Sequence, residues 1–234
     1  MDCFNEEKAN GYFFMSKLAE QAGKYEDSLN FLKDMIDLKI EQVNEDERNH
    51  LLFTNYYMVN ERRRHIKYLI AKEKKENNLI YFSFIQEYKE KIRREICLIC
   101  IDTLKMISLC FEKCNDDESR GLYLTIMGDY NKIIAEFTST ECKIEYSEKA
   151  LKLYFKAKNF PKDLMSTLKL TENISTIYHD FLTDKLKAKN ILKNFITDYQ
   201  KELNSLDTKE YDSENILSKV KDFEEKILKW ANDA

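Results

Sequence analysis

The chain has 234 residues, of which 43% are hydrophobic and 34% charged, so it holds enough apolar material for a sizeable core under a solvated surface. It contains 1 proline and 4 glycines, too few for a protein of many short strands and tight turns. The formal charge of −4 disfavours a general nucleic-acid binder. No apolar run approaches the roughly 18 residues that cross a bilayer, and the N-terminus lacks the pattern of a signal peptide. We therefore expect an all-α cytoplasmic protein with neither a nucleic-acid nor a membrane partner.

The first part of the chain carries the periodicity of amphipathic helices. Apolar residues around Leu18, and then from Leu29 to Ile36, recur every three to four positions, which predicts two short helices with Gly23 in the turn between them. The run Asn44–Glu47 offers an acidic helix start. A long helix should follow it and reach the seventies.

A second long helix is predicted from about Phe82 to Lys113, and later breaks divide the rest into shorter helices. Pro161 marks one break because it disfavours helix at the preceding residue. The total of about nine helices with short connections favours antiparallel neighbours in one domain over residues 1–234, with residues 1–8 as a candidate N-terminal extension. Periodicity alone leaves an array of tetratricopeptide type equally plausible. The breaks are predicted at Asn77–Asn78, Asn115–Asp117, Thr140, Asn159–Pro161, Thr183–Asp184 and Ser205–Thr208.

The six cysteines do not form a pattern that would hold a metal. Cys97 and Cys100 share one predicted helix with Cys110 and Cys114, and the 13 residues from Cys97 to Cys110 place the two pairs roughly 20 Å apart, too far for one tetrahedral zinc. Reduced cysteines that act as small core groups are the simpler interpretation. The sequence also lacks a Gly-rich phosphate loop, a nucleophile elbow and metal-spaced histidines. We expect no metal, no cofactor and no enzymatic activity.

Segments along nearly the whole chain are similar, in the same order, to the helices of one family. The matching segments and residues are Lys17–Asp27, Glu47–Asn49, Arg62–Arg63, Tyr88–Ile92, Gly128–Phe137, Leu170, Asn173, Ser175, Tyr178, Leu182, Leu203, Leu206, Tyr211 and Trp230. On these residues the chain resembles a divergent member of the 14-3-3 family, whose dimers bind phosphorylated peptides. The resemblance implies a cup of about nine antiparallel helices that is dimeric through its N-terminal helices.

The resemblance also implies how two copies would meet. In the family, a basic and an acidic residue near the first helical turn pair with an acidic and a basic residue on the partner's fourth helix. Lys24 and Asp27 match the first two positions, and Glu95 and Lys91 match the others. Lys91 and Glu95 are four residues apart and so share a helix face, as a two-fold contact requires. We expect a homodimer, with a heterodimer with another 14-3-3 protein as the alternative. The apolar part of the contact would come from Leu18, Ala22 and Tyr88.

The phosphate site implied by the resemblance is altered. The family holds the phosphate with a lysine and an arginine on the third helix and an adjacent arginine and tyrosine on the fifth, because charged donors suit a dianion. Those positions are Tyr56, Arg63, Lys132 and Ile133 here. Arg63 is unchanged. Lys132 replaces an arginine, so it keeps the positive charge but cannot form a bidentate contact. Tyr56 lacks the ammonium group of the family's lysine, and Ile133 lacks the hydroxyl group of its tyrosine. Lys67, one turn beyond Arg63, could help. Two lost contacts of about 1.5–3 kcal/mol each would weaken phosphate selectivity by about 10²–10⁴-fold.

The remaining groove positions are partly kept. Asn173 matches the asparagine that holds the peptide backbone, and Asp180 matches an acidic residue further along that helix. Glu172 and Thr176 stand where the family has aliphatic residues, so the groove should be more polar. The family usually has a flexible acidic tail after the last helix, and few residues follow Trp230 here, so either this protein lacks the tail or the sequence was trimmed. Without a tail, autoinhibition of the groove by that route is not expected. The sequence favours an adaptor for phosphoserine or phosphothreonine peptides of client proteins; the alternative is a dimeric scaffold that binds unphosphorylated segments or has lost phosphopeptide binding.

Overall fold

The computed structural model describes residues 2–39, 42–160, 163–205 and 213–232, and these residues form nine α-helices and no strand. The all-α prediction is therefore confirmed. A five-residue π-helical segment, η1 (Ile177–Phe181), directly follows the seventh helix. The α-helices are α1 (Asp2–Gln21), α2 (Tyr25–Leu38), α3 (Glu45–Glu73), α4 (Leu79–Glu112), α5 (Asp117–Phe137), α6 (Thr140–Ala157), α7 (Leu164–Thr176), α8 (Lys185–Ser205) and α9 (Ser213–Asn232).

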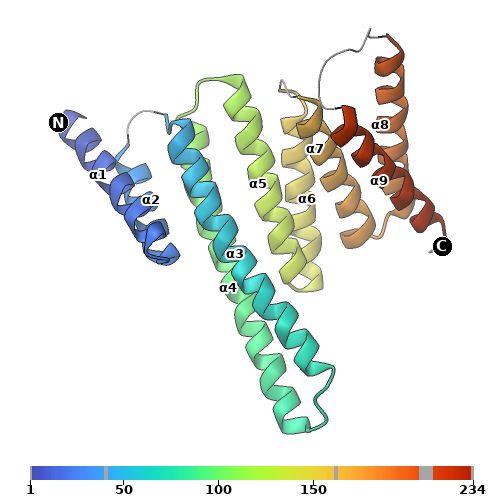
Figure 1. The fold of residues 1–234 in the computed structure, drawn as a ribbon, viewed down its shortest axis with the longest axis horizontal. Helices are drawn as coiled ribbons and strands as arrows, with labels where there is room; N and C mark the ends of the chain where they lie inside the picture. The colour runs from blue at the N-terminus through green and yellow to red at the C-terminus, as the bar shows by residue number, and fades with distance from the viewer. Residues whose placement is uncertain (1, 40–41, 161–162, 206–212, 233–234) are drawn as a thin grey trace.

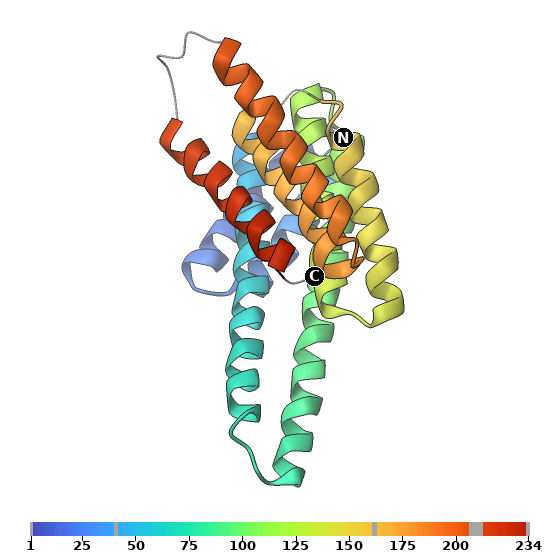
Figure 2. The same cartoon turned by 90° about the vertical axis from the view of Figure 1, so that its right-hand side faces the viewer.

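The helices form an antiparallel array in which neighbours in the chain are neighbours in space (Figure 1). Helices α1 and α2 form a hairpin at the N-terminal end, and α6 to α9 form the C-terminal end. The long α3–α4 hairpin projects well beyond the other helices, as both views show (Figure 2). No helix in the described part of the chain is long and apolar enough to cross a membrane.

Short polar residues set the helix starts that the sequence predicted. The Asn44 side chain accepts a hydrogen bond from the Glu47 backbone N–H at 3.0 Å, and the Glu47 carboxylate accepts one from the Asn44 N–H at 2.9 Å. This reciprocal capping box satisfies two N–H groups that a helix start leaves without partners. Asp116 caps α5 through a single bond, because its carboxylate accepts from the Ser119 N–H at 2.7 Å. Gly23 lies in the predicted turn with φ of 72°, a conformation that favours glycine.

Two predicted boundaries differ from the structure. Helix α1 is not short, because it begins at Asp2 and runs for 20 residues without a break. Helix α4 begins at Leu79 rather than near Phe82, because the Asn78 side chain caps it by accepting from the Ile80 N–H at 2.9 Å. The predicted breaks at Pro161 and after Ser205 fall on positions outside the described residues, as do Leu206 and Tyr211.

Two hydrophobic clusters make up the core. The first is built mainly from α1 to α5 and the second from α6 to α9. They meet where α5 packs on α6 along an extensive contact. Tyr154 of α6 is fully buried at this junction, and its hydroxyl donates a hydrogen bond to Asp129 Oδ1 of α5 at 2.7 Å.

The cysteines that can be placed are free thiols, and three of them lie in the first cluster as predicted: Cys100, Cys110 and Cys114 are buried there. Burial raises the pKa of both Cys100 and Cys110 to about 12, so these thiols stay protonated at neutral pH. Within the described ranges, no group of three or more His, Cys, Asp or Glu side chains could hold a metal ion.

Candidate functional site

A cavity of about 380 Å³ lies between α3 and α5, on the side where α7 faces them. Three of the residues predicted to bind phosphate line it, namely Tyr56, Arg63 and Ile133. Asp129 and Lys169 add charge to its rim, and aliphatic and aromatic side chains of α3 and α5 form most of the remaining wall. We call this cavity the α3–α5 pocket. It combines an apolar wall with a small number of charged groups, a composition common in ligand sites.

Arg63 is held in place at the edge of the α3–α5 pocket. Its Nη2 donates to Glu136 Oε2 at 2.5 Å, and its guanidinium lies 5.5 Å from the centre of the Phe137 ring. The side chain is 30% exposed. Its buried Nε has no hydrogen-bond partner among the described residues. That Nε is closed to solvent, so a ligand in the pocket would meet the exposed part of the guanidinium instead.

Lys132 and Asn173 are bonded to each other behind the pocket. Lys132 Nζ donates to Asn173 Oδ1 at 2.6 Å, and Asn173 Nδ2 donates to Asp129 Oδ1 at 2.7 Å. Burial lowers the pKa of Lys132, while the nearby Asp129 carboxylate opposes this shift. Neither Lys132 nor Asn173 is among the described residues that line the α3–α5 pocket. In this state, two residues predicted to contact a peptide contact each other.

The structure separates two further predicted residues from the pocket. Lys67 is exposed on α3 and is not part of the pocket lining within the described ranges. Asp180 lies in η1, where its carboxylate is 2.5 Å from His179 Nδ1, and the His179 ring stacks on Trp230 at 4.1 Å. The predicted polar position Glu172 is ion-paired with Lys226 of α9. Asp180 thus contacts His179, which packs on α9, and it does not line the pocket.

Lys169 is a pocket residue that the sequence reasoning missed. It lies on α7, its side chain is 66% exposed, and its Nζ is 3.4 Å from Asp129 Oδ2. One signal could have found it, because Lys169 precedes Asn173 by four residues and so shares its helix face. A lone exposed lysine gives no other sign of a role.

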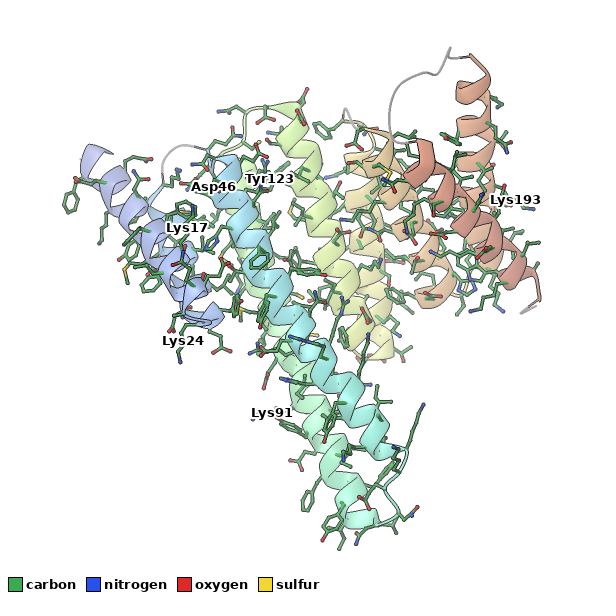
Figure 3. The ribbon with its side chains drawn as sticks, in the orientation of Figure 1. Lys17, Lys24, Asp46, Lys91, Tyr123 and Lys193 are labelled. Carbon is green, nitrogen blue, oxygen red and sulfur yellow. The ribbon has the colours of Figure 1, made fainter. Side chains whose placement is uncertain are left out.

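The residues predicted at the dimer interface lie on two exposed surfaces. Figure 3 shows Lys24 below the α1–α2 hairpin and Lys91 on the projecting part of α4. Glu95 is half-buried, and its carboxylate lies 3.7 Å from Nε of Arg62 in the same subunit. Arg62 also donates to Glu26 of α2 at 2.6 Å, so it links α3 with both surfaces. The exposed members of the predicted set are Leu18, Ala22, Lys24, Asp27, Tyr88 and Lys91.

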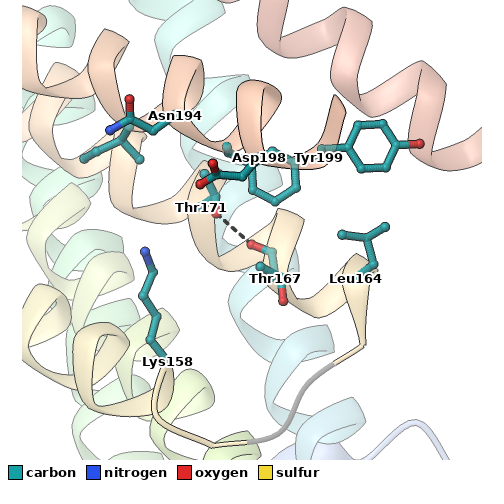
Figure 4. Close-up of a pocket in the computed structure, with 9 residues that line it drawn as sticks. Lys158, Leu164, Thr167, Thr171, Asn194, Asp198 and Tyr199 are labelled. Atoms are coloured by element: carbon teal, nitrogen blue, oxygen red, sulfur yellow. Dashed lines mark hydrogen bonds between the residues drawn. The ribbon is translucent and has the colours of Figure 1, made fainter. Parts of the chain in front are cut away.

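A second cavity, of about 470 Å³, lies between α7 and α8 near the end of α6 (Figure 4). Lys158 and Asp198 are its charged residues. On its α7 wall, Thr171 Oγ1 donates to the Thr167 carbonyl oxygen at 2.8 Å. None of the residues predicted to bind a peptide lines this cavity.

Comparison with known proteins identifies the family. A family model described as "14-3-3 protein" matches residues 15–230. The chain belongs to the 14-3-3 family. A 14-3-3-like protein of Solanum tuberosum is 31% identical over 231 residues, covering 94% of this chain and 88% of that protein. The 14-3-3-like protein B of Nicotiana tabacum is 30% identical, with 94% and 90% covered. The 14-3-3 protein 2 of Entamoeba histolytica is 29% identical, with 94% of both chains covered.

Membership confirms the resemblance predicted from the sequence segments. It supports a phosphopeptide-binding adaptor role for this 14-3-3 protein, and it supports dimer formation in general. Members of the family are adaptors rather than enzymes. The α3–α5 pocket of this 14-3-3 protein holds Tyr56, Arg63 and Ile133, three of the four positions at which the resemblance implied phosphate contacts.

Proposed function

We propose that this protein is an adaptor for phosphoserine or phosphothreonine peptides and that the phosphate binds in the α3–α5 pocket. The observation that carries the proposal is Arg63, which lines the pocket with a side chain that is 30% exposed. A guanidinium has five N–H donors, so its exposed part suits a phosphate oxygen, because charge-assisted hydrogen bonds are short and strong. Phosphorylated segments of client proteins are the partners this site would take.

The pocket is altered, and its selectivity should be reduced accordingly. Tyr56 is 68% exposed and offers one hydroxyl donor, and Ile133 offers none. Glu136 already engages Arg63, so an incoming phosphate must share that guanidinium or displace the carboxylate. We therefore expect the phosphorylated form to bind more weakly than it would to an unaltered pocket, but more tightly than the unphosphorylated form.

The apolar wall of the pocket supports a second candidate function. Val59, Ile126 and Ile133 line the same cavity as Arg63, and Lys132 is bonded to Asn173 instead of facing it. A scaffold with this groove could take an unphosphorylated segment through an apolar side chain, because apolar contact needs no anion. The two functions differ in one measurable property, the ratio of affinities for phosphorylated and unphosphorylated forms of one peptide.

Partner copies of the chain are part of the proposal. Lys24 and Asp27 of one copy would pair with Glu95 and Lys91 of the other, around an apolar contact that includes Tyr88. Two grooves in one dimer would raise the effective concentration for a doubly phosphorylated client. A heterodimer with another 14-3-3 protein would use the same surfaces.

Fluorescence polarisation with matched phosphorylated and unphosphorylated Arg-Ser-x-Ser-x-Pro-type peptides tests the function. We expect tighter binding of the phosphorylated form, and we expect Arg63→Glu to abolish that difference because it replaces the central cation with an anion. Arg64→Glu is the matched control, since Arg64 is exposed and does not line the pocket. Far-UV circular dichroism should show that both variants remain folded. Equal binding of the two peptide forms by the unmodified protein would instead establish the scaffold.

A further inference from the structure

Lys169 supplies a positive charge to the α3–α5 pocket at a place where the sequence indicated a loss. The expected lysine of α3 is replaced by Tyr56, which leaves Arg63 as the one cation that α3 contributes to the described lining. Lys169 lines the same pocket from α7, so it approaches Arg63 and Tyr56 from another helix. We infer that Lys169 binds the phosphate of a peptide held in this pocket and restores the charge that Tyr56 lacks. The inference rests on the proposed function.

The contacts of Lys169 leave its ammonium group able to bind a ligand. Its Nζ lies 3.4 Å from Asp129 Oδ2, longer than the 2.7–2.9 Å typical of a charge-assisted N–H···O bond. Asp129 does not depend on it, because Asp129 Oδ1 accepts from Tyr154 and Asn173, each at 2.7 Å. An ammonium carries three donors and sits on a flexible stem, so it can turn from Asp129 to an anion in the pocket.

The other lysines near the site are less suitable. Lys132 is half-buried and donates to Asn173 Oδ1 at 2.6 Å, so binding a phosphate would require it to leave that acceptor. Lys67 is exposed but does not line the pocket within the described ranges. Among the described lining residues, the cations are Arg63 and Lys169. A phosphate dianion between them would be held by one guanidinium and one ammonium, on two different helices.

Fluorescence polarisation with the phosphoserine peptide and its unphosphorylated form tests the inference. We expect Lys169→Ala to weaken binding of the phosphorylated peptide by about 10- to 100-fold, the loss typical of one charged hydrogen bond. Binding of the unphosphorylated peptide should not change. Lys169→Arg should keep most of the affinity because it keeps the charge. Lys193→Ala is the charge-matched control, since Lys193 is exposed on α8 and remote from the pocket (Figure 3).

A rescue experiment separates a direct charge effect from a structural one. In the Lys169→Ala background, Tyr56→Lys should reverse at least half of the change in the logarithm of the dissociation constant for the phosphorylated peptide. The reason is that this substitution returns a cation to the opposite wall of the pocket. Failure to reverse this change would contradict the inference, and so would a larger loss for Lys67→Ala than for Lys169→Ala.

The proposed function and the inference fail in different ways. If Lys169→Ala binds the phosphorylated peptide as tightly as the unmodified protein while Arg63→Glu does not, the adaptor function stands and the role of Lys169 is wrong. If the unmodified protein does not distinguish the two peptides, both are wrong. Far-UV circular dichroism of each variant checks that the helices are intact.

Discussion

Gly128 lies on α5 where that helix packs closely against Tyr154 of α6. A Cβ added to it would lie 2.4 Å from Cε1 of Tyr154. Tyr154 is fully buried, and its hydroxyl is fixed by Asp129, so its ring cannot swing aside without breaking that hydrogen bond. Glycine at this position is therefore a packing requirement of the α5–α6 junction.

We predict that Gly128→Ala lowers the free energy of unfolding by about 1–3 kcal/mol, because overpacking outweighs the gain in helix propensity of about 1 kcal/mol. Gly11→Ala is the matched control: Gly11 is helical in α1 and a Cβ there meets nothing within 4 Å. That variant should be stabilised by about 0.5–1 kcal/mol. Urea unfolding followed by circular dichroism gives both values. A Gly128→Ala protein as stable as the unmodified one would show that α6 can move away.

The sequence allowed part of the candidate site to be predicted at this scale. Arg63, Tyr56 and Ile133 were found because the family's phosphate contacts sit at fixed positions on two helices, and the helices themselves were easy to recognise. The bond between Lys132 and Asn173 could not be predicted, because it depends on how closely α5 packs against α7. Lys169 was missed for the same reason, since only the packing brings it to the α3–α5 pocket.

At the scale of single helices, the caps determine where each element begins. Asp116 illustrates this for α5, because its carboxylate accepts from the Ser119 N–H at 2.7 Å and from Gln42 Nε2 at 2.8 Å. The Ser119 backbone bond, followed by the Gln42 bond, lowers the pKa of Asp116 from 3.8 to about 2. The ionised form is thus favoured in the folded protein. Its contribution to stability is fully present above pH 4 and is lost as the pH falls toward 2.

We predict that Asp116→Asn makes the stability of the protein less sensitive to acid between pH 4 and pH 2. Asparagine keeps an oxygen that can cap α5, but it does not titrate in this range. The measurement is the free energy of unfolding as a function of pH for both proteins. Near pH 7 the variant should be the less stable of the two, and the difference should shrink as the pH falls. Parallel acid profiles would contradict the assigned role of the Asp116 charge.

Helix boundaries were the most predictable feature of the fold, and their errors have local causes. Asn44, Gly23 and Asp116 act on backbone groups within a few residues, so the sequence alone shows their effect. The length of α1 was underestimated because its N-terminal half has no strong apolar period, yet Ala9 is buried and Tyr12 stacks on Phe31 of α2 at 6.3 Å. Tertiary packing on α2 therefore stabilises a segment whose own sequence signal is weak.

At the scale of the whole molecule, two rows of apolar side chains are exposed to solvent on the described helices α1 and α4. On α4, Tyr81, Phe84 and Tyr88 are exposed and spaced three and four residues apart, so they share one face with Lys91. On α1, Phe14 and Leu18 are exposed at the same spacing. Apolar patches of this kind mark interaction surfaces. Opposite charges beside them favour pairing of one copy's α1–α2 hairpin with the other copy's α4.

We predict that Lys91→Asp weakens self-association by about tenfold, because the two-fold axis repeats the repulsion with Asp27 and each exposed pair contributes about 0–1 kcal/mol. The double variant Lys91→Asp with Asp27→Lys should recover most of the affinity, since it exchanges the charges without removing them. Sedimentation velocity over a concentration series gives the dissociation constants. Unchanged association in the single variant would place the interface elsewhere.

The junction between the two hydrophobic clusters gives the pocket a mechanical property. Arg63 stands on α3, in the N-terminal half, and Lys169 on α7, in the C-terminal half. A phosphate bound by both side chains would link the two halves of the protein across the junction between α5 and α6, and the link would be lost when the peptide leaves. Because a ligand stabilises the form that binds it, the backbone amides at the α5–α6 junction should exchange with solvent more slowly when a client peptide is bound. Client binding would then reduce local opening of the adaptor itself at this junction.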